Sequence, residues 1–375
     1  MKRTLLTLCL LALLPLPLQA DSPRRIDSER AAFILEEVID GLGIPWGMAF
    51  ISDNRLMFTE RKGDIKLLDT LTRKVTLLQG APAVFDRGQA GMLDVAVPPD
   101  FSPGDWIYFT FVRERDNQGV TVLARARLKG DRLVQWQDLL ETKSGSGTGR
   151  HFGSRIAFDE KGHVYFGVGD RGERPNSQNL RNHAGSVMRL YRDGRIPKDN
   201  PFIGRDDVLP ETWSYGHRNP QGMAYDDANR RLWLIEHGPR GGDEINLVLR
   251  GRNYGWPVIS YGKEYWGPMA VGEGTHRKGM EQPVKQYTPS IAPGSLLLYS
   301  GKAFPAWKGN LFTGALKLRH LNRVTLNKNG NAVGEERLLS DLDERIRALT
   351  ESLQGWLYFS TDSGRIFVIR PAGPD

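Results

Sequence analysis

Two neighbouring polar segments in the second half of the chain carry residue types suited to metal and anion chemistry. Residues 236–246 read Glu-His-Gly-Pro-Arg-Gly-Gly-Asp-Glu-Ile-Asn, and residues 215–222 read Tyr-Gly-His-Arg-Asn-Pro-Gln-Gly. Carboxylates and backbone carbonyls in flexible loops are ligands for calcium, and guanidinium groups bind carboxylates in pairs of hydrogen bonds. The mixture predicts that these loops hold an anionic ligand together with a hard metal ion.

Four shorter segments carry complementary chemistry. His151 is a candidate general base, because histidine has an ordinary pKa close to neutral pH. Gln89 and Asn219 can hydrogen-bond the carbonyls or ring nitrogens of a ligand. Four cations together suit a planar polyanion, and these are Arg218, Lys317, Arg345 and Arg347. The four segments span residues 88–94, 149–155, 314–317 and 345–347.

The elements that must position these residues follow a loose repeat that occurs six times. Each unit is an apolar run, a polar turn with Gly or Asn, and a short aromatic run, as in residues 46–59. The residue before each turn falls at positions 50, 97, 158, 225, 299 and 350, which are 47 to 74 residues apart. Repeats of this size made of short strands indicate propeller blades. The sequence therefore predicts an all-β fold, a six-bladed β-propeller.

The repeat also predicts how the ring closes and where a site lies. A last strand at 365–370 is expected to pair with a strand near 33–38, which removes exposed sheet edges; only residues 28–39 also fit a helical period. Each polar segment lies at the edge of a repeat, and such edges converge on the central channel. Taken singly, these residues also fit structural roles, and Asp243 with Glu244 fits surface charge. The prediction of one site rests on one polar segment per blade.

The N-terminus has the composition of a secretory signal peptide. Lys2 and Arg3 precede an apolar run that ends near Leu18, and Ala20 is a small residue before the expected cleavage point. We therefore expect a periplasmic or secreted protein, a single propeller domain over 21–375 and no membrane span in the mature chain; an uncleaved anchor is the alternative. Cys9 is the one cysteine, so cleavage excludes disulfides and thiolate chemistry.

Charge and motifs exclude several other classes. The net charge is +7, and Lys and Arg are scattered among Asp and Glu, which indicates a solvated surface and no nucleic-acid partner. Residues 145–149 are glycine-rich, but no Lys-Ser/Thr follows them, so a phosphate loop is not expected. The chain has no His-Glu-x-x-His and no Gly-x-Ser-x-Gly motif.

Several longer motifs match one enzyme family. They are His-Phe-Gly at 151–153, Arg-Asn-Pro-Gln-Gly-Met at 218–223, the whole of 236–246 and Asn-Tyr-Gly-Trp-Pro at 253–257. With these motifs, the chain from about residue 41 to 369 resembles the soluble aldose sugar dehydrogenases that depend on pyrroloquinoline quinone (PQQ), relatives of soluble glucose dehydrogenase. PQQ is a tricarboxylate orthoquinone, which agrees with the four cations.

The resemblance implies a fold, a reaction and catalytic residues. The family fold is a six-bladed propeller, and its cofactors are PQQ and Ca²⁺. His151 resembles the family's proton acceptor, which takes the proton of the C1 hydroxyl of an aldose while a hydride passes from C1 to the quinone. Arg218 resembles the residue that stabilises charge on the quinone oxygen. The lactone results, and electrons leave to an external acceptor, a quinone or a cytochrome, since the chain has no haem-attachment motif.

The resemblance also implies binding residues. Gly238 and Pro239 match backbone ligands of the calcium that sits on PQQ, and Glu244 and Tyr254 match a second, structural calcium site. The positions that match PQQ contacts are Gln89, Arg218, Asn219, Tyr265, Ala315, Leu316, Lys317, Arg345 and Arg347.

Two departures from the family pattern lie beside the expected base. Arg150 stands where a small acidic or amide residue is usual, and a cation there could change the preference for sugar or acceptor. Ser154 replaces the glycine of a His-Phe-Gly-Gly-Arg pattern.

Two other functions stay open on the sequence. One is a calcium-dependent propeller lactonase or other hydrolase, which would need acidic metal ligands in the channel. The other is a non-catalytic, ligand-binding propeller, in which His151 would be dispensable.

Overall fold

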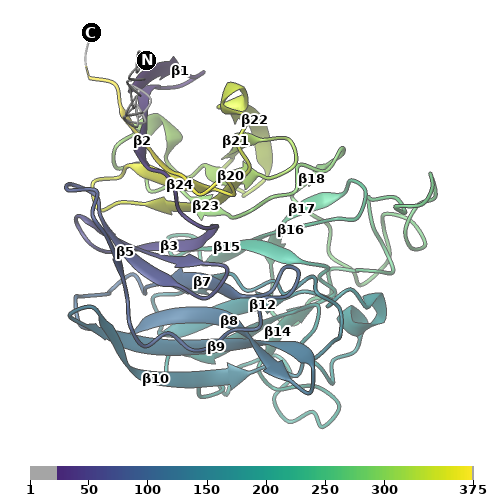
Figure 1. Ribbon diagram of the computed structural model, residues 1–375. Coiled ribbons are helices and arrows are strands. Elements are labelled where there is room, and N and C mark those ends of the chain that lie inside the picture. Colours follow the sequence, from purple (N-terminus) through teal and green to yellow (C-terminus); the bar gives the residue numbers. More distant parts are fainter. Residues whose placement is uncertain (1–22, 374–375) are drawn as a thin grey trace, which may run out of the picture.

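Six antiparallel sheets form the blades of a propeller in the computed structural model (Figure 1), which describes residues 23–373. The prediction of an all-β, six-bladed β-propeller is confirmed. The predicted signal peptide, residues 1–20, lies outside the described residues. None of the helices in residues 23–373 is long and apolar enough to cross a membrane.

The blades are numbered here in chain order, and five of them contain four consecutive strands each. Blades 1 to 3 are β3 (Pro45–Ser52), β4 (Arg55–Glu60), β5 (Ile65–Asp69) and β6 (Val75–Leu77); β7 (Met92–Ala96), β8 (Ile107–Arg115), β9 (Gln118–Lys129) and β10 (Arg132–Glu141); and β11 (Ile156–Phe158), β12 (His163–Val168), β13 (Ser186–Tyr191) and β14 (Thr212–Tyr215). Blades 4 and 5 are β15 (Pro220–Asp226), β16 (Arg231–Glu236), β17 (Asp243–Val248) and β18 (Lys285–Tyr287); and β19 (Leu297–Leu298), β20 (Leu311–Ala315), β21 (His320–Leu326) and β22 (Ala332–Leu338).

Blade 6 is built from both ends of the described chain. Its strands are β1 (Arg24–Asp27), β2 (Ala32–Ile39), β23 (Ile346–Glu351), β24 (Leu357–Thr361) and β25 (Ile366–Pro371). Three short 3-10 helices lie between strands: η1 (Arg174–Gln178), η2 (Pro305–Trp307) and η3 (Ser340–Leu342).

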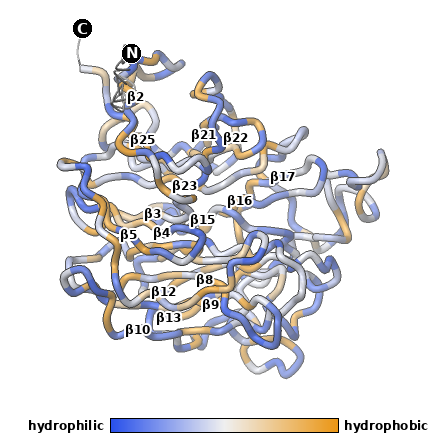
Figure 2. Tube along the Cα trace, in the orientation of Figure 1, coloured by the Kyte–Doolittle hydropathy of each residue, from blue (hydrophilic) through white to orange (hydrophobic). Residues whose placement is uncertain are grey.

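Each of the six repeat units of the sequence corresponds to the two innermost strands of one blade, for example β3 with β4 in blade 1 and β23 with β24 in blade 6. In β8, for example, the apolar residues do not alternate with polar ones, and residues 107–112 are all buried. Both faces of a blade are covered by neighbouring blades, so a strand inside a blade needs apolar side chains on both faces. Figure 2 shows the same pattern, with hydrophobic residues along the strands and hydrophilic ones in the loops.

The hydrophobic core is divided among the interfaces between blades. Blades 5 and 6 enclose Trp307, Phe312 and Phe359, whereas blades 1 and 2 enclose Met57 and Phe109. Four similar clusters fill the other interfaces. Each blade is therefore stabilised mainly by its two neighbours, and the site must be built where the innermost strands meet.

Pairing between β2 and β25 closes the ring. Phe33 lies opposite Pro371, and the antiparallel register continues to Ile39 opposite Ile366. The predicted closure is confirmed, and the helical period of residues 28–39 is wrong, because pairing on both sides by β1 and β25 holds residues 32–39 extended. Figure 2 shows β2 and β25 next to each other.

One buried arginine joins all six blades at the axis. Arg155 forms a 2.9 Å ion pair with Asp94 of β7. It donates to the carbonyls of Gln221, Gly294 and Arg347, and its guanidinium lies 4.0 Å from the ring centroid of Trp46. These partners belong to blades 1, 2, 4 and 6 and to the segment before blade 5, while Arg155 itself precedes β11 of blade 3. We call Arg155 with Asp94 the axial ion pair.

Candidate active site

A cavity of about 320 Å³ lies on the axis, at the end of the blades where the innermost strands begin. Its polar lining consists of the cations Arg61, Arg345 and Arg347, the amides Gln89, Asn219 and Gln221, and His237. Among the described residues, no Asp or Glu lines this cavity. The arrangement favours an anionic ligand with carbonyl or ring-nitrogen acceptors.

His151 is held by a carboxylate in the geometry of a general base. Its Nδ1 lies 2.6 Å from Oδ1 of Asp170, and the other oxygen of Asp170 accepts from Nε1 of Trp256 at 2.8 Å. Asp170 is 1% exposed. Burial would raise the pKa of Asp170, but the hydrogen bond and charge of His151, the amide of Gly172 and the charge of Arg218 together outweigh burial and lower that pKa. Nδ1 of His151 therefore carries a proton, and Nε2 is left as the acceptor.

The same surroundings keep His151 neutral. Burial lowers its pKa below the ordinary value, and the charges of Arg218 and Arg150 act in the same direction, against Asp170. A neutral imidazole at pH 7 can accept a proton, so the electrostatics suit the base predicted from the sequence.

The backbone around His151 is strained. His151 has φ = 58° and Ser154 has φ = 92°, both in the left-handed region that favours glycine. Gly153, also left-handed, has no room for a side chain, since a Cβ would lie 2.6 Å from the carbonyl oxygen of Gly167. The amide of His151 donates to Oε1 of Gln89 at 2.9 Å. Ser154 therefore occupies a conformation for which the family pattern has glycine.

Arg171 holds the loop that precedes His151. Its guanidinium is buried, donates to the carbonyls of Ser144, Thr148 and Arg150, and lies 3.5 Å from the ring centroid of Phe152. Burial lowers the pKa of Arg171 to about 10. The glycine-rich segment 145–149 thus wraps around an arginine.

Asp362 aligns two cations of the cavity. Its carboxylate accepts from Nε of Arg345 at 2.8 Å and from Nε and Nη2 of Arg347 at 2.8 and 2.9 Å. The two guanidinium groups outweigh burial and lower the pKa of Asp362. With their Nε atoms occupied, both arginines keep further N–H groups for a ligand.

Arg218 lies between the cavity and the loop 236–246. Its Nη1 donates to the carbonyl of His237 at 3.1 Å, and its Nη2 donates to the hydroxyl of Tyr265 at 3.3 Å. Nε2 of His237 donates to the carbonyl of Pro293 at 2.7 Å, and burial lowers the pKa of His237 to about 3. His237 is therefore a neutral group on the cavity wall.

Asp243 shapes the turn that carries two of the predicted calcium ligands. Its carboxylate accepts from the amides of Gly238 and Ala292 and from the hydroxyl of Ser290. The hydroxyl of Tyr265 donates to the carbonyl of Pro239 at 3.2 Å. Asp243 is thus occupied by the protein itself, and the carbonyls of the turn are the oxygens available to a metal ion there.

A second group of oxygens lies between β16 and β17. Glu236 and Glu244 are directly opposite each other in the two strands. Burial, with the charge of Glu236, raises the pKa of Glu244 to about 8. Nδ2 of Asn246 donates to both carboxylates, and its Oδ1 is buried without a hydrogen-bond partner among residues 23–373. Tyr254, whose hydroxyl donates to the carbonyl of Leu247, stacks on His217, which bonds Glu236.

The structure brings most of the predicted catalytic and cofactor-binding residues to one cavity or its edge. Gln89, Asn219, Leu316, Arg345 and Arg347 line it, with His151 and Arg218 beside it. Two predicted cofactor contacts, Tyr265 and Lys317, line a neighbouring cleft. Ala315 is fully buried in β20. No cluster of three or more His, Cys, Asp or Glu residues with metal-binding geometry occurs in residues 23–373.

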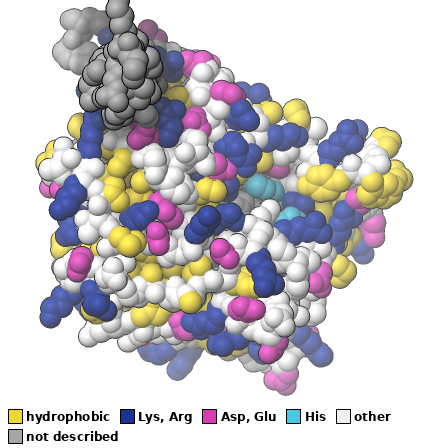
Figure 3. All heavy atoms as spheres, viewed as in Figure 1, with side chains coloured by type: hydrophobic (Ala, Val, Ile, Leu, Met, Phe, Trp, Pro, Cys, Tyr) yellow, Lys and Arg dark blue, Asp and Glu magenta, His cyan; other side chains and the backbone are white. Residues whose placement is uncertain are grey.

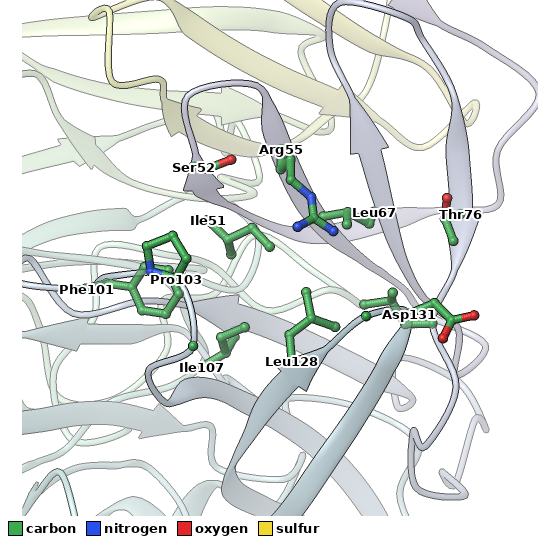
Figure 4. A pocket seen from close by; sticks show the side chains of 13 residues that line it. Ile51, Ser52, Arg55, Leu67, Thr76, Phe101, Pro103, Ile107, Leu128 and Asp131 are labelled. Atoms are coloured by element: carbon green, nitrogen blue, oxygen red, sulfur yellow. The ribbon is translucent and has the colours of Figure 1, made fainter.

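Another cavity, of about 410 Å³, lies between blades 1 and 2 where β3 ends (Figure 4). Its lining is mainly apolar, as with Ile51, Ile107 and Leu128, and includes one cation, Arg55. Within the described part of the chain, its one lining carboxylate is Asp131, and the lining has no histidine and no amide side chain, so it does not offer the chemistry of the axial cavity.

Sequence reasoning missed several residues of the site: Asp170, Trp256, Arg61, Arg171 and Asp362. Asp170 lies two residues after a fully buried strand, His163–Val168, and an acid at such a position is a signal that could have identified it and its neighbour Arg171. Arg61, Trp256 and Asp362 come to the site from separate segments whose positions depend on the complete ring.

The chain is similar to known proteins over most of its length. The model of the Glucose / Sorbosone dehydrogenase family matches residues 42–369. The chain is 38% identical to the aldose sugar dehydrogenase YliI of Escherichia coli, over 90% of this chain and 92% of that protein. The structure of the E. coli soluble aldose sugar dehydrogenase in its apo form superposes with a TM-score of 0.86 at 35% identity, covering 90% and 99% of the two chains.

A second similar structure is the PQQ-bound aldose sugar dehydrogenase of Streptomyces coelicolor. It is 26% identical, has a TM-score of 0.73, and the match covers 89% of this chain and 96% of that one.

Proposed function

Because the chain belongs to the glucose/sorbosone dehydrogenase family and is an oxidoreductase, we propose that it oxidises aldose sugars at C1 to the lactone. Its cofactors in this proposal are PQQ and calcium, and an external acceptor takes the electrons. The observation that carries the proposal is the pair His151–Asp170 beside a cavity lined by cations and amides.

The proton is handled by His151. Its Nδ1–H donates to Asp170, so Nε2 takes the proton of the C1 hydroxyl. As the imidazolium forms, the Asp170 carboxylate stabilises the charge, and Trp256 keeps that carboxylate in place. PQQ, when bound, supplies the acceptor for the two electrons that leave C1. Arg218 would stabilise negative charge on a cofactor oxygen that faces the sugar.

The lining of the axial cavity fits a planar tricarboxylate. Arg345 and Arg347 are already oriented by Asp362, which reduces the entropy lost when they bind carboxylates. Arg61 adds a third cation, and Asn219 and Gln221 add amides. Lys317 would reach such a ligand from the neighbouring cleft.

Two sets of oxygens fit calcium. The carbonyls of Gly238 and Pro239 would hold an ion at the cavity, where calcium acts as a Lewis acid when bound. The facing carboxylates of Glu236 and Glu244, with the unpartnered Oδ1 of Asn246, form a hard donor set that a cation would relieve of repulsion. Tyr254 adjoins this second set through His217.

The deciding experiment is dye reduction by purified apoprotein with an aldose, with and without added PQQ and calcium. Activity that requires both additions supports the proposal. Tight PQQ binding without turnover across an aldose panel would point to another alcohol or aldehyde substrate, and absence of PQQ binding would refute the assignment.

The two alternatives are less well supported. A propeller hydrolase needs acidic metal ligands in the central cavity, whereas the residues that line it are cations and amides. A non-catalytic propeller gives no reason for a neutral histidine paired with a buried carboxylate.

Export is part of the proposal. The charge and apolar pattern of residues 1–20 supports a cleaved signal and a periplasmic or secreted protein. N-terminal sequencing of the protein from fractionated cells tests it; a mature chain that starts at Asp21 is the expected result, and an intact Met1 start in the cytoplasm would refute it.

A further inference from the structure

A second, larger cleft of about 650 Å³ adjoins the axial cavity; we call it the outer cleft. Arg240, Lys263 and Lys317 line it, and all three side chains are exposed. Across residues 23–373, no ion pair joins any of them to an acidic group, and the lining of the outer cleft has no Asp or Glu. Figure 3 shows Lys and Arg side chains gathered around the histidines visible on this face.

The outer cleft stays cationic because the acid of its own hairpin is turned away. Lys263 is bridged to Arg240 by two backbone hydrogen bonds of 3.2 Å, and it pairs with Ala270 in the hairpin 263–270. Glu264, the one acid of that hairpin, binds both Nη atoms of Arg174 at 2.7 Å. Three unpaired cations in one concavity attract anions.

Two aromatic side chains at the hairpin tip add flat apolar faces. Tyr265 is 65% exposed and Trp266 is 74% exposed. Large aromatic groups exposed side by side are typical of binding surfaces. The Tyr265 hydroxyl accepts a hydrogen bond from Arg218, so one wall of the outer cleft is continuous with the active site.

From this combination, and resting on the proposed function, we propose that the outer cleft binds the part of the substrate remote from C1, and that this part is anionic. The substrate class is then a reducing oligosaccharide that carries carboxylate groups. Its reducing end enters the active site, its acidic residue meets Arg240 and Lys263, and a sugar ring packs on Trp266. A concave cleft of this volume fits a small ligand rather than a flat protein surface.

The kinetic test compares digalacturonate with neutral galactobiose, using the enzyme loaded with PQQ and calcium. At low ionic strength, wild-type kcat/KM is expected to be about tenfold higher for the acidic sugar, since a charge-assisted contact is worth about a factor of ten. The double variant Arg240→Gln/Lys263→Gln should abolish this preference and leave kcat/KM for galactobiose unchanged. Salt should reduce the preference in wild type.

The matched control is Lys129→Gln/Lys328→Gln, which removes two exposed cations at the opposite end of the blades, one at the end of β9 and one in the turn after β21. This variant should keep the full preference. A loss of preference in the control would show that only net charge matters and would overturn the proposal.

A binding test is independent of turnover. Titration of the apoprotein with digalacturonate should change tryptophan fluorescence, and the change should be lost in Trp266→Phe. Absence of turnover with both sugars would refute the proposed function while this titration still reported on the cleft. Equal kcat/KM for the two sugars would overturn the inference alone. So would a double variant that slows ferricyanide reduction without changing the sugar preference, because the cleft would then serve an anionic electron acceptor.

Discussion

Replacing Arg155 with methionine tests whether the axial ion pair holds the six blades together. Arg155→Met removes the partner of a carboxylate that is 6% exposed, Asp94, and removes a donor to three backbone carbonyls. Breaking a buried ion pair on one side costs about 4 kcal/mol. A chain of this length has an unfolding entropy of about 0.75 kcal/mol/K. The melting temperature should therefore fall by about 5 °C.

The pH dependence of the stability loss distinguishes an effect of the unpaired Asp94 charge from an effect of lost side-chain packing. Burial already raises the pKa of Asp94 against the pull of Arg155, and loss of Arg155 raises it further. A carboxyl whose pKa is raised in the folded state favours folding at low pH, and that contribution is lost as pH rises through the folded pKa. The fall in melting temperature caused by Arg155→Met should therefore be larger at pH 8 than at pH 5.

Scanning calorimetry at a fixed scan rate measures both effects. The control is Asp94→Leu/Arg155→Met, in which no buried charge is left alone; its deficit should be smaller and independent of pH. A single variant that melts within 1 °C of wild type (a limit set by roughly 1 kcal/mol of stability), or a deficit equal at both pH values, would refute the role assigned to Arg155.

Four further predictions concern the site. His151→Ala should bind PQQ normally and lose about 10²–10⁴-fold in kcat, measured by dye reduction beside a PQQ titration; near-normal turnover would contradict its role as base. Arg150→Gln removes a charge that lowers the pKa of His151, so the acid limb of kcat/KM should move to higher pH, and an unmoved limb at low salt would show that Arg150 lies too far away. Ser154→Gly should stabilise the protein by about 1 kcal/mol, because it relieves a left-handed φ; a lower melting temperature would mean that the lost side-chain hydrogen bond to Phe152 matters more. Calcium at 100 times its dissociation constant should add about 2.7 kcal/mol of stability and Glu244→Gln should weaken that gain, whereas chelation without effect on wild-type melting would exclude the second calcium site.

The blades could be predicted from the sequence because their signals are local. Each inner strand pairs with the next strand through a short polar turn, so one unit such as residues 46–59 shows both strands and their turn. The ring closure could also be predicted, since unpaired edges at both ends of the chain require partners. The outer cleft is different: Tyr265 lies in the long segment between β17 and β18, and no local pattern determines the course of that segment. Lys317 comes to the same cleft from the end of β20.

The contact between His151 and Asp170 could be predicted only in part from the sequence. His151 stands in a recognisable motif, but Asp170 comes from the far end of β12, and their contact requires that β11 and β12 pair in the observed register. Arg155 is the last residue of the His-Phe-Gly-Gly-Arg pattern, but nothing nearby in the chain indicates that its partners lie in blades 1, 2, 4 and 6 and in the segment before blade 5. Roles of this kind arise from the ring as a whole.

The pairing of β2 with β25 sets a condition on the order of folding. Arg365 and Glu37 form an ion pair across 328 residues of chain, so the first long strand cannot find its permanent neighbour until the last one exists. During synthesis, or during export through a narrow pore, blades 1 to 5 can form and pack against one another while the edge of β2 that binds β25 is still unpaired. An unpaired strand edge can instead pair with the same strand of another copy of the chain. The yield of this protein should therefore depend on how quickly its final segment follows the rest.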